Sequence, residues 1–144
     1  MKLLHHWHTI LNMPQHDETW HRQDLADELA EYNESTSLID RWSELSDVVY
    51  TYTRACWSGH SSISFPFSRV RFFLGTLYMI PKYTLRWSFF RKLGRQFDAN
   101  LRISEVRNPK KIEKLEKIAE KYNLDKDQFV AKAEQLMKYW PFLK

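Results

Sequence analysis

The chain has little cysteine, glycine or proline, and it has no long apolar run. Its 144 residues include 1 Cys, 3 Gly and 5 Pro. A single cysteine excludes an intrachain disulfide framework and favours a reducing compartment, while the shortage of glycine and proline excludes collagen-like and linker-like chains. The most apolar stretch, residues 72–80, lies between Arg71 and Pro81. It is far shorter than the roughly 20 residues that span a bilayer, so we expect no transmembrane helix.

The first residues also lack the features of a targeting sequence. Residues 1–13 contain one Lys and three His, without the apolar run of a secretory signal or the Arg and Ser enrichment of a transit peptide. We therefore expect a cytoplasmic protein. What the chain does have, 43% hydrophobic and 15% aromatic residues, is enough apolar surface for a core, so we predict a single domain over residues 1–144.

Charge is divided along the chain. Residues 1–60 carry 4 basic and 10 acidic residues, a net charge of −6, whereas residues 61–144 carry 18 and 8, a net charge of +10. All acids of the first part lie between Asp17 and Asp47. An acidic cluster followed by a basic half suggests a metal site together with a phosphate-bearing ligand or an acidic partner.

Hydrophobic periodicity predicts helices along the whole chain after residue 17. Asp17 is a candidate N-cap for a helix over residues 19–32. Ser37 and Asp40 form a capping box that opens a second helix, whose apolar positions keep helical spacing until Gly59. A short turn between the two helices requires them to pack antiparallel.

Proline and capping residues set the later predictions. We expect a third helix that starts at Pro66 and ends or kinks before Pro81, and a fourth over residues 82–100. Asn108 and Pro109 predict the start of a helix that ends near Asn123, and Asp125 with Gln128 opens a last helix. Because no strand-like alternation is present, the predicted fold is an all-α helical bundle of four core helices plus C-terminal helices.

Each of the first two predicted helices carries a pair of acids three residues apart. The pairs are Glu28 with Glu31 and Glu44 with Asp47. At about 100° per residue, each pair lies along one flank of the apolar stripe of its helix, so antiparallel packing can bring the two flanks together. Four converging carboxylates repel one another unless a cation joins them. Oxygen ligands of this kind suit Mg²⁺, with Mn²⁺ as a second choice.

These pairs resemble a known signature. The string DELAE at 27–31, followed by 12 residues and then ELSD at 44–47, resembles the ExxE and ExxD motifs of the MazG-like, all-α nucleoside triphosphate pyrophosphohydrolases. The resemblance implies a Mg²⁺-dependent hydrolase that cleaves NTP or dNTP to NMP and pyrophosphate, and that works as a dimer or tetramer.

Residue by residue, the resemblance implies that Glu28, Glu31, Glu44 and Asp47 are the metal ligands and catalytic residues. Asp27 takes the place of an extra acid before the first motif. The basic and amide residues that contact phosphate in the family would correspond here to Lys92, Arg95, Asn100 and Arg102. On this basis the catalytic core would cover residues 17–102, and residues 103–144 would form a C-terminal helical extension.

Other interpretations stay open. The acids can be solvated helix faces, in which case the protein is a non-catalytic helical module whose basic, aromatic second half binds nucleic acid or an acidic partner. The discriminating observation is whether the four carboxylates converge. A zinc site built from the histidines is disfavoured because no HExxH motif is present. Cys56 is expected to be a buried structural thiol. The aromatics of residues 61–90 can form core, subunit interface or, least favoured, an interfacial membrane segment.

Overall fold

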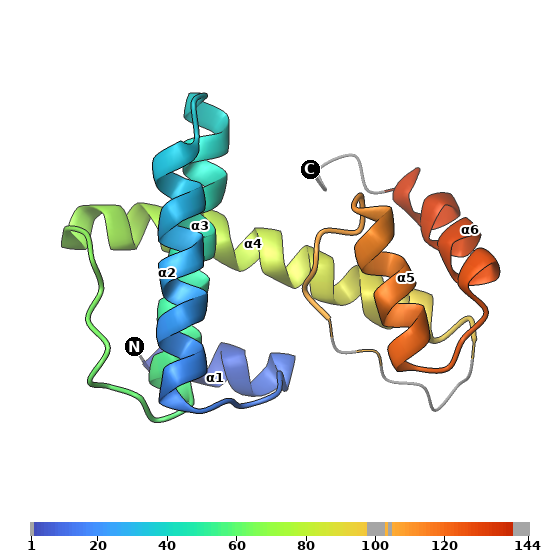
Figure 1. Ribbon diagram of the computed structural model, residues 1–144, viewed down its shortest axis with the longest axis horizontal. Coiled ribbons are helices and arrows are strands. Elements are labelled where there is room, and N and C mark those ends of the chain that lie inside the picture. The colour runs from blue at the N-terminus through green and yellow to red at the C-terminus, as the bar shows by residue number, and fades with distance from the viewer. Residues whose placement is uncertain (1, 98–102, 104, 140–144) are drawn as a thin grey trace. The chain divides into compact units, whose positions relative to one another are not determined.

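Within the residues that the computed structural model describes, 2–97, 103 and 105–139, the chain forms helices and no strand (Figure 1). The all-α prediction is therefore confirmed. The helices are α1 (Lys2–Leu11), α2 (Glu18–Glu34), α3 (Leu38–Trp57), α4 (Arg69–Gly94), α5 (Ile112–Lys121) and α6 (Lys126–Met137). None of them is both long and apolar enough to cross a membrane.

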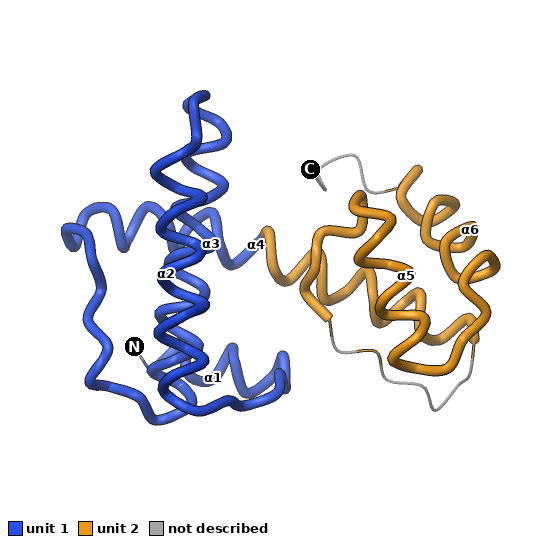
Figure 2. Tube along the Cα trace, viewed as in Figure 1, with its two compact units in different colours: residues 1–81 blue, residues 82–144 orange. Residues whose placement is uncertain are grey.

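The chain divides into two compact units, residues 1–81 and residues 82–144 (Figure 2). The boundary falls inside α4, directly after Pro81. The prediction of a single domain with a core over residues 17–102 remains a prediction.

In the first unit, α2 and α3 form the expected helical hairpin. The side chain of Asp17 accepts a hydrogen bond from the Trp20 amide at 2.8 Å, and that of Ser37 accepts one from the Asp40 amide at 3.0 Å. Both caps satisfy amides that have no partner within the helix. Beyond the last turn of α3, Gly59 has a φ of +95°, a left-handed conformation that suits glycine after a helix end. The hairpin encloses a small core in which Val48 and Ala55 are buried.

Two further helices pack against α3. The His8 ring of α1 lies with its Nε2 at 2.9 Å from Thr53 Oγ1, and Trp57 Nε1 donates to Thr9 Oγ1 at 3.1 Å. The first part of α4 approaches α3 at Gly75, where a Cβ atom would lie only 2.7 Å from Val49 Cγ2. Helix α1 was not among the predicted helices, because its buried face includes a histidine where a pattern search expects an apolar residue.

Of the two outcomes predicted at Pro81, a helix end or a kink, the helix end is wrong, since α4 runs through this residue. Proline removes one amide donor, and the carbonyl that it leaves without a helical partner belongs to Leu77, four residues earlier. Leu77 is 57% exposed, so water can reach this position. Burial of Met79 and Tyr83 on either side of Pro81 holds both turns in place. The helix also begins at Arg69, three residues after the predicted Pro66.

The second unit joins the last part of α4 to α5 and α6. Its core contains Phe89, Phe90 and Phe129. Asp125 caps α6 as predicted, accepting from the Gln128 amide at 2.8 Å. The predicted start of α5 at Asn108 and Pro109 is wrong: Asn108 instead closes a turn by accepting from the Lys110 amide at 3.0 Å, and the helix begins at Ile112.

Candidate metal centre

Three of the four predicted ligands converge in the first unit. Glu28, Glu31 and Glu44 each offer a carboxylate oxygen, and these three oxygens all lie within 4.8 Å of one another. Glu28 and Glu31 come from α2, one turn apart, and Glu44 comes from the facing part of α3. We call these three residues the glutamate cluster. The expected meeting of the two helix flanks is therefore present in the structure.

The glutamate cluster lies at the edge of the core. Glu28 and Glu44 are half-buried, and Glu31 is exposed. Three acids in this position can supply several hard oxygen ligands while leaving one side open to water. This is the arrangement that Mg²⁺ sites usually show, because Mg²⁺ keeps waters and substrate phosphates among its ligands. The donor set thus fits a hard divalent cation.

Electrostatics within the glutamate cluster are unfavourable for the ionised acids. The pKa of Glu28 is raised from 4.5 to about 8, chiefly by its burial and then by the negative charges of Asp47, Glu31, Asp24 and Glu44. A carboxyl group with this pKa holds its proton at neutral pH. A divalent cation at the same position would displace the proton and offset the repulsion.

Asp47 is close to the glutamate cluster without belonging to it. Its charge is the largest charge contribution to the raised pKa of Glu28, yet its oxygens lie outside the group that meets within 4.8 Å. Asp27, expected as an extra acid, is exposed and accepts a hydrogen bond from Gln23 at 2.8 Å. This contact is a local one within α2.

Asp24 is an acid of the site that was not among the predicted residues. This acid lies four residues before Glu28, on the same side of α2, and its charge contributes to the raised pKa of Glu28. The signal was the spacing itself, since side chains at i and i+4 are neighbours on a helix. Asp24 places a further carboxylate beside the glutamate cluster.

The predicted phosphate-contacting residues lie elsewhere in the chain. Lys92 is in α4 and Arg95 directly follows it, and both belong to the unit of residues 82–144. Asn100 and Arg102 lie outside the described residues. Their contacts with phosphate remain a prediction.

The histidines form a separate group at the other end of the helical hairpin. The ring centroids of His21 and His60 are 5.3 Å apart, and those of His16 and His21 are 6.2 Å apart. Burial, followed by the charge of Arg54, lowers the pKa of His21 to about 4. Among the residues that can be described, the glutamate cluster is the one set of three or more His, Cys, Asp or Glu side chains with converging ligand atoms.

Two of the large aromatic side chains on α2 and α3, those of Trp20 and Tyr50, are engaged within the protein. Trp20 stacks on His16 with ring centroids 4.0 Å apart, and Tyr50 is buried beside Trp7. Trp42, in contrast, is 42% exposed. Its ring remains accessible to a ligand.

Comparison of the chain with protein-family models, curated proteins and solved structures found no match. The resemblance to the MazG-like enzymes therefore rests on the two acid pairs.

Proposed function

We propose that the protein is a Mg²⁺-dependent hydrolase that cleaves a nucleoside triphosphate to NMP and pyrophosphate. The observation that carries the proposal is the convergence of the half-buried Glu28 and Glu44 with the exposed Glu31. Clustered acids raise the free energy of the folded protein when no cation is present. A divalent metal bound between the two helices would offset this repulsion and lower the free energy of the folded protein.

The residues have distinct roles in this proposal. Glu28, Glu31 and Glu44 hold the metal, which, when bound, neutralises charge on phosphate oxygens and lowers the pKa of a coordinated water. Asp47 lies beside the ligands without being one of the converging three, so we assign it as the general base that orients the attacking water. Water attacks the α-phosphorus and gives its proton to Asp47, the bond from that phosphorus to the bridging oxygen breaks, and pyrophosphate leaves, so that NMP keeps the oxygen of the water.

Substrate contacts come from other parts of the chain. Lys92 and Arg95, with Asn100 and Arg102, are proposed to contact the phosphates, and Trp42 offers an exposed ring for stacking on a base. The resemblance also implies a homo-oligomer, dimer or tetramer, and a cytoplasmic location. These remain parts of the proposal.

The test is pyrophosphate release from a panel of canonical and modified NTPs and dNTPs, with Mg²⁺, with Mn²⁺ and with EDTA. Release should require the metal and should be lost in Glu44→Gln. The matched control is Glu34→Gln, which removes an exposed carboxylate from the end of α2, outside the glutamate cluster, and should keep full activity. Equal activity in the two variants, or release in EDTA, would contradict the proposal.

A second candidate function is favoured by a different feature of the chain. In the second unit, Arg107, Lys114, Lys117 and Lys121 line a cavity of about 280 Å³ together with Glu105. Basic residues therefore outnumber acids around this cavity. Its acid, Glu105, accepts a hydrogen bond from Lys121 at 2.7 Å. This basic surface supports a non-catalytic module that binds nucleic acid or an acidic partner. Salt-dependent binding of single- or double-stranded oligonucleotides, by a protein without pyrophosphate release, would favour this second function.

A further inference from the structure

A cleft lies between α1 and the last turns of α3, at the end of α3 away from the glutamate cluster. Its volume is about 620 Å³, within the range of small-molecule sites. The lining residues are Lys2, Leu4, His5, His6, Thr9, Tyr52, Thr53, Cys56, Trp57 and Ser61. Cys56 is half-buried and faces this cleft, which corrects the expectation of a fully buried thiol.

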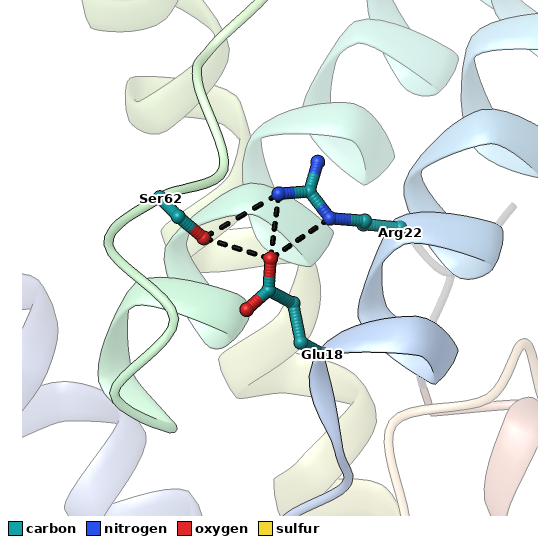
Figure 3. Close-up of polar contacts among 3 residues, drawn as sticks. All are labelled: Glu18, Arg22 and Ser62. Atoms are coloured by element: carbon teal, nitrogen blue, oxygen red, sulfur yellow. Dashed lines mark hydrogen bonds and ion pairs between the residues drawn. The ribbon is translucent and has the colours of Figure 1, made fainter.

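Hydrogen bonds hold α1 against α3 and anchor the segment beside Ser61. Helix α1 is joined to α3 by the His8–Thr53 and Trp57–Thr9 contacts, 2.9 and 3.1 Å long. The segment that contains Ser61 is held by its neighbour Ser62, whose hydroxyl donates to Glu18 Oε1 at 2.8 Å (Figure 3). The same oxygen accepts from Arg22 Nη2 at 2.6 Å. A cleft with walls fixed in this way is formed before a ligand arrives, which lowers the cost of binding.

The chemistry of the walls is asymmetric. On the α1 side stand Lys2, His5 and His6, which all offer N–H donors, and none of the described residues that line the cleft is Asp or Glu. On the α3 side stand the rings of Tyr52 and Trp57. Donors without acceptor acids suit an anionic group, and the two rings suit a flat, apolar body that can stack on them.

We propose that this cleft binds a small organic anion with a planar aromatic body. The site is separate from the glutamate cluster, because Tyr52, the lining residue of α3 nearest to Glu44 in sequence, follows it by eight residues, or about 12 Å along the axis of α3. The inference therefore stands whether or not the protein hydrolyses nucleotides.

The experiment titrates 2-naphthoate into the full chain and follows the backbone amides by NMR. 2-Naphthalenemethanol, which has the same rings without the charge, is the matched neutral probe. The test variant is His6→Glu, and the control is Leu3→Glu, which adds the same carboxylate to α1 at an exposed residue that does not line the cleft. Lys2→Glu is the second test variant if His6→Glu lowers the melting temperature.

We expect saturable shifts for residues 2–9 and 52–61, and weaker binding of the neutral probe. A carboxylate placed beside the anion should weaken naphthoate binding about fivefold or more in His6→Glu, against less than about twofold in Leu3→Glu. Absence of saturation at millimolar naphthoate, equal affinity for the two probes, or equal effects of the two variants would overturn the proposal.

Discussion

Binding of Mg²⁺ to the glutamate cluster should depend steeply on pH, because the ion and a proton compete for Glu28. The pKa of this carboxyl group is about 8 in the metal-free protein. A metal ligand must be deprotonated, so the apparent affinity scales with the ionised fraction of Glu28. We expect binding to tighten about ninefold from pH 6 to 7, about fivefold from pH 7 to 8, and less than about twofold from pH 8 to 9.

Isothermal titration calorimetry measures both the affinity and the protons released. In buffers of different ionisation enthalpy at pH 7, binding of one Mg²⁺ should release about 0.9 proton, since about nine tenths of Glu28 is protonated before binding. The titration is made without nucleotide, whose phosphate groups titrate in the same range.

Two variants assign the proton to this residue. Glu28→Gln should bind Mg²⁺ more weakly, and its remaining affinity should hardly change between pH 6 and 8. Glu34→Gln should keep the pH dependence of the unsubstituted protein. Constant affinity over this range without proton release would refute the argument, as would an unchanged proton release in Glu28→Gln.

Three further predictions concern stability. The pKa of Glu28 in the folded protein is above its unfolded value of 4.5, so its contribution to the free energy of unfolding is highest below pH 4.5 and falls as pH rises towards 8. Glu28→Gln should therefore stabilise the metal-free protein at pH 7 by about 1 to 2 kcal/mol, allowing for partial exposure. Urea unfolding measures this change, and an unchanged midpoint would contradict the prediction. Burial lowers the pKa of His8 from 6.5 to about 3, so the pH dependence of stability has the opposite sign to that of Glu28. The free energy of unfolding falls as pH drops below 6.5. Between pH 7 and 5 the unsubstituted protein should therefore lose about 2 kcal/mol more of this free energy than His8→Asn does. Equal losses in the two proteins would show that the ring is protonated without cost. Gly75→Ala should destabilise the protein by about 1 to 3 kcal/mol although alanine favours helices, because its Cβ atom would lie 2.7 Å from Val49 Cγ2. In a double-mutant cycle, Val49→Ala should remove most of this cost. Additive effects of the two substitutions would argue against the clash.

The helical hairpin was predictable because its signals are local. Asp17 and Ser37 cap their own helices through residues three positions away, and Gly59 adopts a conformation that follows from its lack of a Cβ atom. Interactions this close in sequence are visible without knowledge of the tertiary structure.

The missed features depend on distant contacts. Helix α1 buries His8 completely, with its ring against Thr53, which lies 45 residues away. Pro81 remains inside a helix because Met79 and Tyr83 are buried on either side of it. Local preference favoured an exposed histidine and a helix break, and packing overrode both.

The same distinction explains how far the site could be predicted. Spacing alone places Glu44 and Asp47 on one flank of α3, about 60° apart. Which of the two reaches Glu28 and Glu31 depends on how α3 is rotated against α2, and that rotation is set by the burial of Leu45, Val48 and Val49. The structure brings Glu44 into the group and leaves Asp47 beside it.

The stability cost of the glutamate cluster is itself an argument for a ligand. Local helix preference does not require acids at Asp24, Glu28, Glu31 and Glu44, and burial, followed by the repulsion of the neighbouring acids, raises the pKa of Glu28 far above its ordinary value. Replacing any of them with glutamine would relieve the repulsion at little cost in helix preference. Solvated acidic faces avoid this cost by pointing into water, as Asp27 does. A divalent cation that joins these acids would offset this cost, and this is the physical reason why the proposed metal binding would account for the arrangement.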